Sequence, residues 1–177
     1  MKQSLTDQDA ELHERLSADE KALVRRHQKQ APVDVRALAA DLGLNVYKDD
    51  LGQDVSGVLK RDARDAGPSG WVVLVNTDHN RNRQRFTIAH EIGHFLLHRE
   101  RAEEEGEVTD DYFYRAFSSP IEQEANAFAA DLLMPTHLLA RAMDDGFTHL
   151  DDLARLFRVS KQSMAIRLGV PYDQDWE

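Results

Sequence analysis

The stretch RFTIAHEIGHFLLH, residues 85–98, decides how this chain is interpreted. It sets His90 and His94 four residues apart and places Glu91 directly after the first histidine. On an α-helix, residues four apart lie about 6 Å along the axis and about 40° around it, so both imidazoles leave from one face. Such a pair can bind one zinc ion, and a glutamate in this position can act as general base on a water at the metal. The HExxH pattern therefore predicts a metal-binding helix with hydrolytic chemistry.

A buried helix with two ordinary histidines is the alternative. Apolar residues dominate the stretch, and Gly93 leaves space for a neighbouring backbone. Histidines in so apolar a helix need polar partners, because burying them unpaired is costly. This need favours the metal site. His98 lies about 12 Å along the axis from His90, too far for the same tetrahedron, and is expected to support or cap the site.

The third ligand must come from another segment, because a catalytic zinc usually has three protein ligands. Residues 118–135, SSPIEQEANAFAADLLMP, carry an apolar stripe at helical spacing. Glu124 lies next to Ala125 and one turn before Phe128, whereas Glu122 is assigned toward solvent. Glu124 is therefore the chosen ligand. The alternative is an ordinary amphipathic helix whose acidic residues favour its N-terminal dipole.

Composition restricts the class of protein. Of the 177 residues, 41% are apolar and 31% charged, which is typical of a soluble globular chain. No apolar run approaches the roughly 20 residues of a membrane span, and the N-terminus lacks an apolar signal core. The absence of cysteine indicates a cytoplasmic setting and leaves only His, Asp and Glu as metal ligands. The net charge of -10 opposes nonspecific attraction to nucleic acid.

The order of apolar patterns predicts an α+β fold. Three strands are expected at 44–48, 55–60 and 71–76, forming a small sheet that is antiparallel in part. Helices are expected at 81–100, 120–134, 136–144, 150–157 and 161–168, the last two at helix-turn-helix spacing. The first part of the acidic run 100–115 is expected to be a solvated loop. Strand 71–76 is expected to border the cleft and to hold an extended substrate at its edge.

These elements predict a zincin-like core. A small twisted sheet is expected to pack on the HExxH helix, with the Glu124 helix crossing it and a helical, helix-turn-helix-like C-terminal region. The predicted division is a helical N-terminal extension (1–30), a metallopeptidase domain (31–145) and the C-terminal region (146–177). The sequence indicates no role for the extension and no oligomeric state.

The runs RQRFTIAHEIGHFLLH and EQEANAFAADLLMP together resemble the ImmA/IrrE family of bacterial and phage metallopeptidases, and the similarity spans roughly residues 31–169. The resemblance implies that His90, His94 and Glu124 bind zinc and that Glu91 is the catalytic base. It gives Asn126 a structural or supporting role. The donor for the transition-state oxyanion is left open among four residues: Tyr112, Tyr114, Arg115 and His137.

The leading functional hypothesis is a zinc endopeptidase acting on one cytoplasmic protein. The resemblance implies that this substrate is a helix-turn-helix repressor of stress or mobile-element genes. A second hypothesis is a DNA- or repressor-binding module in residues 148–169, which are locally basic through Arg155, Arg158, Lys161 and Arg167. A third is a toxin–antitoxin partner with a structural metal, although structural zinc normally has four protein ligands. Manganese or cobalt would also suit a His/His/Glu site.

Overall fold

The computed structural model describes residues 5–105, 107–111 and 119–172, and within them the chain is α+β. In chain order the elements are α1 (Leu5–Glu14), α2 (Ala18–His27), α3 (Val35–Asp41), β1 (Asn45–Asp49), β2 (Val55–Arg61), β3 (Trp71–Asn76), α4 (Arg81–Leu97), α5 (Arg99–Glu105), β4 (Glu107–Asp111), α6 (Pro120–Leu133), α7 (Thr136–Asp144), α8 (Leu150–Phe157) and α9 (Lys161–Leu168). The expected strands and helices are confirmed to within a few residues at their ends.

The sheet has the strand order β1-β3-β2-β4. β1 pairs with β3 in parallel, with Asn45 opposite Val72, whereas β2 is antiparallel to both β3 and β4. The expectation of a partly antiparallel sheet is therefore confirmed. β3 has a neighbour on each side, so the expectation that strand 71–76 offers an edge to a substrate is wrong. Both rows of its backbone hydrogen-bonding groups face other strands of the sheet.

The acidic run after α4 is ordered differently from the expected solvated loop. Its first part forms α5, and residues 107–111 form β4 on the edge of β2. Arg61 of β2 donates to Glu103 of α5 at 2.6 Å, which holds the helix against the sheet. One acidic side chain of α5, Glu103, therefore has a cation on the neighbouring strand as its partner.

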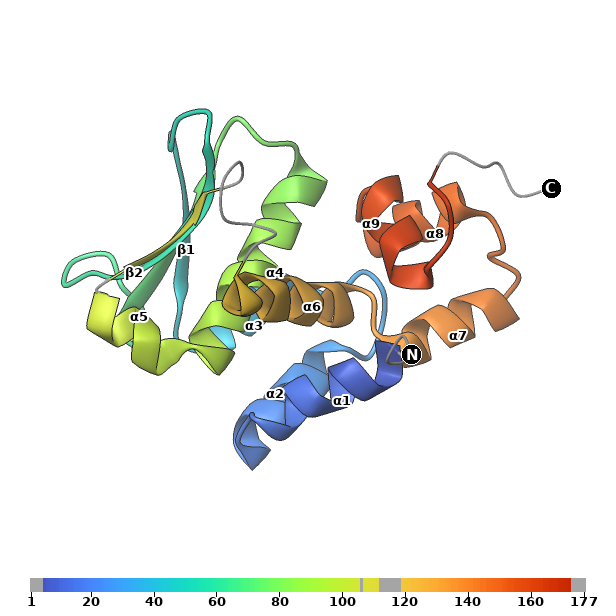
Figure 1. Cartoon of the computed structure of the whole chain (residues 1–177), viewed down its shortest axis with the longest axis horizontal. Helices are drawn as coiled ribbons and strands as arrows, with labels where there is room; N and C mark the ends of the chain where they lie inside the picture. Colours follow the sequence, from blue (N-terminus) through green and yellow to red (C-terminus); the bar gives the residue numbers. More distant parts are fainter. Residues whose placement is uncertain (1–4, 106, 112–118, 173–177) are drawn as a thin grey trace.

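Helix α4 lies between the sheet and α6. Figure 1 shows α4 beside the sheet, with α6 crossing it and leading to α7, while α8 and α9 lie at the far end of the molecule. The crossing of α4 and α6 is close because Gly93 has no side chain: a Cβ there would lie 3.2 Å from the Phe128 ring and 3.3 Å from the Cα of Ala125. The space expected at Gly93 is thus filled by α6.

One buried apolar cluster runs through the N-terminal, central and C-terminal parts of the chain. It includes Leu12, Val24, Ile92, Leu132 and Phe157, all at most 5% exposed. The division at residues 30 and 145 stays a prediction, as does the helix-turn-helix character of α8 and α9. None of the helices in the described ranges has both the length and the apolar composition of a membrane span.

Candidate metal centre

The central helix of the site, α4, is covered along most of its length. Its N-cap is Asn80, whose side chain accepts from the backbone N–H of Arg83 at 3.0 Å. From Thr87 to Leu96 every residue is buried, because the sheet covers one side and α6 the other. His90 is 2% exposed, and Glu91 and His94 are fully buried. Three ionisable side chains in one buried helix require polar partners.

The two imidazoles converge on one point beside α6. Their Nε2 atoms lie 2.9 Å apart, and the Glu122 carboxylate faces both, at 3.2 Å from His90 and 3.3 Å from His94. Bonds of about 2.1 Å at tetrahedral angles would hold two ligands of one zinc ion about 3.4 Å apart. The spacing of these three side chains therefore fits a metal ion, and they form the one His/Asp/Glu cluster of that kind in the described residues.

The structure places Glu122, and not the expected Glu124, beside the two histidines. Glu122 is 9% exposed and faces the histidines, whereas the Glu124 side chain is 36% exposed and points to His98 and Arg15. Ala125 lies where α6 meets α4 at Gly93, and Glu122 precedes it by one helical turn on the same face. The spacing of Glu122, Ala125 and Ala129 was the signal that could have identified the inward carboxylate.

Each metal-facing histidine has a polar partner at its other ring nitrogen. His90 Nδ1 donates to the side-chain oxygen of Asn126 at 3.1 Å, which agrees with the supporting role expected for that residue. His94 Nδ1 lies 3.2 Å from Nδ1 of His98. Partners of this kind fix the ring orientation and the tautomer, so that Nε2 presents its lone pair to the metal.

Electrostatics keep the cluster in its metal-binding protonation state. Burial lowers the pKa of His94 to about 4, although the Glu122 hydrogen bond acts in the opposite direction. Burial raises the pKa of Glu122, but the interactions of its carboxylate with the neighbouring His90 and His94 imidazoles outweigh burial and hold that pKa well below its usual range. At neutral pH, His94 is neutral and Glu122 is a carboxylate. These are the forms that bind a divalent cation.

Glu91 lies on the sheet side of α4, against β2. A Cβ at Gly57 would come within 2.9 Å of Glu91 Oε1 and 2.3 Å of the Thr87 methyl group. The carboxylate of Glu91 therefore occupies space that a side chain on β2 would otherwise fill. Of the four oxyanion candidates, Tyr112, Tyr114 and Arg115 lie outside the described residues. His137 donates to the backbone oxygen of Gln28 at 2.8 Å, in the contact between α7 and the N-terminal helices.

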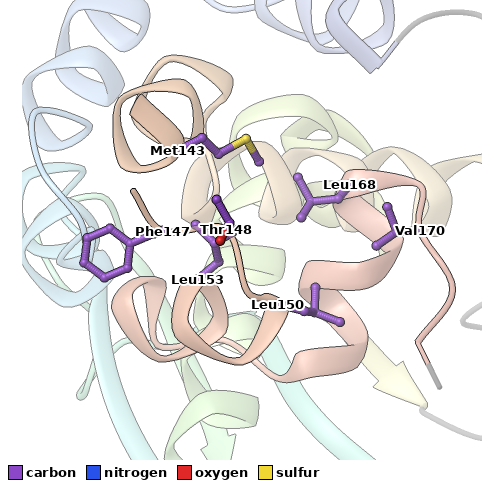
Figure 2. Close-up of a pocket in the computed structure, with 7 residues that line it drawn as sticks. All are labelled: Met143, Phe147, Thr148, Leu150, Leu153, Leu168 and Val170. Atoms are coloured by element: carbon purple, nitrogen blue, oxygen red, sulfur yellow. The ribbon is translucent and has the colours of Figure 1, made fainter. Parts of the chain in front are cut away.

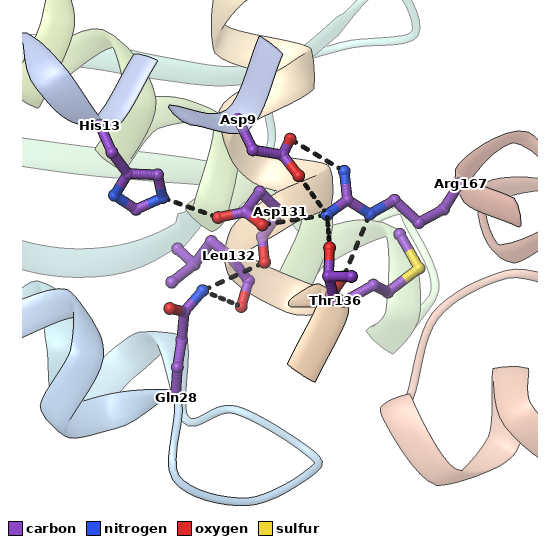
Figure 3. Close-up of polar contacts among 8 residues, drawn as sticks. Asp9, His13, Gln28, Asp131, Leu132, Thr136 and Arg167 are labelled. Carbon is purple, nitrogen blue, oxygen red and sulfur yellow. Dashed lines mark hydrogen bonds and ion pairs between the residues drawn. The ribbon is translucent and has the colours of Figure 1, made fainter. Parts of the chain in front are cut away.

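The basic residues of α8 and α9 are engaged within the chain. Arg167 is 5% exposed and donates to Asp9 and Asp131, as Figure 3 shows. Arg155 pairs with Asp152, and Lys161 with Asp151. These ion pairs neutralise much of the positive charge that suggested a nucleic-acid surface.

A hollow lies among the C-terminal helices. Met143, Phe147, Leu153 and Val170 are among its lining residues, and Thr148 supplies its polar atom (Figure 2). Its lining contains no titratable side chain.

Comparison with known proteins agrees with this geometry. A model of the IrrE N-terminal-like peptidase domain matches residues 39–169. The site is thus that of a metallopeptidase family, and the chain belongs to the ImmA/IrrE family of metallopeptidases.

Three curated relatives cover different shares of this chain. An uncharacterized immunity region protein 2 of Bacillus phage phi105 is 30% identical over 134 residues, 75% of each chain. The radiation response metalloprotease IrrE of Deinococcus deserti is 37% identical over 111 residues, 58% of this chain and 37% of that protein. Metallopeptidase ImmA of Bacillus subtilis is 31% identical over 117 residues, 64% of this chain and 62% of that protein. The chain thus spans less than two thirds of the two relatives named as peptidases.

A solved structure supports the fold. A Mycobacterium tuberculosis transcriptional regulator matches 92% of this chain with a TM-score of 0.55 and 19% identity, and the match covers 52% of that chain. At this identity the likeness concerns the path of the backbone. It shows that the arrangement of sheet and helices also occurs within a larger protein.

Proposed function

We propose that this chain is a zinc-dependent endopeptidase in which His90, His94 and Glu122 hold the metal and Glu91 is the general base. The observation that carries the proposal is the convergence of two imidazole nitrogens and one carboxylate on two packed helices: the nitrogens lie 2.9 Å apart, and each lies 3.2–3.3 Å from one of the two carboxylate oxygens. Two imidazoles and one carboxylate match the ligand set of catalytic zinc sites that keep an open position.

Each side chain has a distinct task in this mechanism. A bound zinc ion would acidify water and polarise the scissile carbonyl. Asn126 holds the His90 ring so that its Nε2 faces the site. Glu91 follows His90 by one residue, about 100° around α4, and takes a proton from water for delivery to the leaving amine. Burial of α4 strengthens these interactions, because the site is largely shielded from solvent.

The proposed substrate is one specific cytoplasmic protein, a helix-turn-helix repressor of stress or mobile-element genes. Support comes from the immunity region of the phage relative and from the radiation response named for IrrE. Docking surfaces outside the site would provide the specificity, because an unrestrained protease inside a cell is harmful. The alternative, a DNA- or repressor-binding module with a structural metal, makes a different prediction for the Glu91 variant below.

The test combines metal content with cleavage. Elemental analysis of the dialysed wild-type chain should find close to one zinc per chain, and His90→Ala should lose it. Repressors of the host genome are then incubated with the chain, and the fragments are identified by mass spectrometry. Glu91→Gln should keep its zinc and lose cleavage by a factor of about 10²–10⁴.

Two results would contradict the proposal. A wild-type chain that takes up no zinc, manganese or cobalt has no metal site of the proposed kind. A Glu91→Gln chain that binds metal and still relieves repression in cells would favour the binding-module alternative. His27→Ala is a suitable control, because His27 pairs with Asp41 on the N-terminal helices, outside the metal cluster.

A further inference from the structure

We propose that His98 and Glu124 position the metal ligand His94, and that Arg15 from the N-terminal segment anchors them. The inference rests on the proposed metal site and deepens it. It assigns a task to the carboxylate that does not face the metal, and it gives the N-terminal extension a connection to the site.

The hydrogen bonds from His94 through His98 to Glu124 form a relay with one consistent direction. When His94 Nε2 ligates a metal, its ring proton must be on Nδ1, which lies 3.2 Å from His98 Nδ1. His98 Nδ1 must then accept, so its own proton is on Nε2, which lies 2.8 Å from Glu124 Oε2. A carboxylate accepts and does not donate, so the chain ends there. The geometry therefore selects the His94 tautomer that leaves Nε2 available to the metal.

Burial predicts how strongly each link acts. His94 is fully buried and His98 is 8% exposed, so their hydrogen bond is shielded from water. The side chains of Glu124 and Arg15 are 36% and 42% exposed, and solvent weakens their ion pair. The effect on metal binding should therefore decrease from His98 to Glu124 to Arg15.

Arg15 connects the relay to a part of the chain outside the family match, which begins at residue 39. It lies between α1 and α2, and one guanidinium nitrogen donates to Glu124. The other donates to the backbone oxygen of Leu97 at 3.0 Å, at the C-terminal end of α4. One side chain thus ties together the N-terminal segment, the relay and the end of the metal-bearing helix.

The test measures zinc affinity of the full chain by competition with a chromophoric chelator at neutral pH. His98→Ala should weaken zinc binding about 10–100-fold, and Glu124→Ala about 10-fold. Glu124→Gln should bind nearly as well as wild type, because its amide oxygen still accepts from His98. Arg15→Ala should change the affinity less than about 5-fold, and His27→Ala should leave it unchanged.

A matched pair on one helix separates a positioning role from a ligand role. Glutamine is a poor substitute for a ligating carboxylate, so Glu122→Gln should lose the metal while Glu124→Gln retains it. Cobalt-loaded protein gives a second readout, since reorientation of the His94 ring changes the d–d absorption spectrum. That spectrum should change in His98→Ala and stay the same in Glu124→Gln.

The outcomes distinguish this inference from the proposed function. If His98→Ala binds zinc as the wild type does, with an unchanged cobalt spectrum, the relay is wrong and the metal site stands. Equal loss of metal in Glu124→Gln and Glu122→Gln would make Glu124 a ligand and overturn the relay. A wild-type chain without metal overturns both. If His98→Ala does not fold, His98→Asn replaces it: its amide oxygen can accept from His94 but cannot reach Glu124, so affinity should fall only to the level of Glu124→Ala.

Discussion

The two ends of α6 carry two buried polar clusters that differ in how their charge is balanced. Near the start of the helix, the Glu122 carboxylate faces two imidazoles, and His94 is neutral at ordinary pH. Near its end, Asp131 faces the guanidinium of Arg167, which also binds Asp9 at 2.7 and 3.0 Å. Figure 3 shows the second cluster, in which each charged group has a partner of opposite charge.

This difference separates a functional cluster from a structural one. In the Arg167 cluster the cation is built into the fold, and the polar groups hold α1, α6 and α9 together. In the Glu122 cluster the protein supplies ligands of the kind that a divalent cation requires. Similar burial on the same helix thus accompanies cohesion at one end and the proposed metal site at the other.

The largest expected effect is at the metal cluster, for Glu122→Gln. Removing one of three ligands should reduce the metal content from close to one per chain to close to zero and abolish cleavage. The unfolding free energy without metal should change by only about 1 kcal/mol, because the glutamine amide can still form a hydrogen bond with an imidazole nitrogen. Elemental analysis and urea denaturation measure the two quantities. Retention of one zinc per chain would contradict the ligand assignment.

Arg167→Met should have the opposite effect, a large loss of unfolding free energy with little change in metal content. It leaves Asp9 and Asp131 buried without their cation, which should cost about 3–5 kcal/mol of unfolding free energy. Metal content per folded chain should stay near that of the wild type. Arg155→Met is the matched control, because its pair with Asp152 is largely exposed and should contribute less than about 1 kcal/mol. Similar losses in both variants would remove the distinction between the buried and the surface cation.

Adding zinc should stabilise the chain through the Glu122 cluster alone. At a free zinc concentration 100 times Kd, the gain is about 2.7 kcal/mol. For a chain of this size that raises the melting temperature by roughly 5–10 °C. Wild type and Arg167→Met should show equal increases in thermal melts, whereas Glu122→Gln should show almost none. An increase in Glu122→Gln would mean that zinc binds elsewhere.

The smallest expected effect is that of His13→Phe. His13 donates to Asp131 at 2.8 Å and its ring lies 6.2 Å from that of Phe128, so phenylalanine keeps the ring contact and loses the hydrogen bond. Asp131 keeps its bond from Arg167, and the unfolding free energy should fall by about 1 kcal/mol. Urea denaturation measures this loss. A loss comparable to that of Arg167→Met would show that the histidine, and not the arginine, balances Asp131.

Local signals in the sequence predicted much of the fold. Ser17 and Glu20 form a capping box at the start of α2, and Pro120 begins α6 next to the N-cap Ser119. Strand β4 could not be predicted in this way, because EVTDD lacks alternating apolar residues and pairs with β2 only in the tertiary structure.

The site was predicted only in part, because some of its contacts form only in the tertiary structure. The spacing of His90 and His94 is a property of one helix, so the sequence alone indicated that both face one point. The choice between Glu122 and Glu124 depended on which face of α6 meets α4. The spacing of Glu122, Ala125 and Ala129 marks one face of α6, and the contact of Gly93 with Ala125 shows that this is the face against α4. Arg15 and Glu124 are 109 positions apart, and neither residue indicates the other in the sequence.

The absence of a side chain at Gly57 limits how the sequence around the HExxH helix can vary. A single methyl group there would collide with Thr87 and crowd the Glu91 carboxylate, while the HExxH residues themselves remained unchanged. A substitution at this strand position, outside the HExxH residues, would therefore disturb the carboxylate that the proposed mechanism uses as its base. An intact HExxH sequence does not by itself mean a working site in a chain of this architecture.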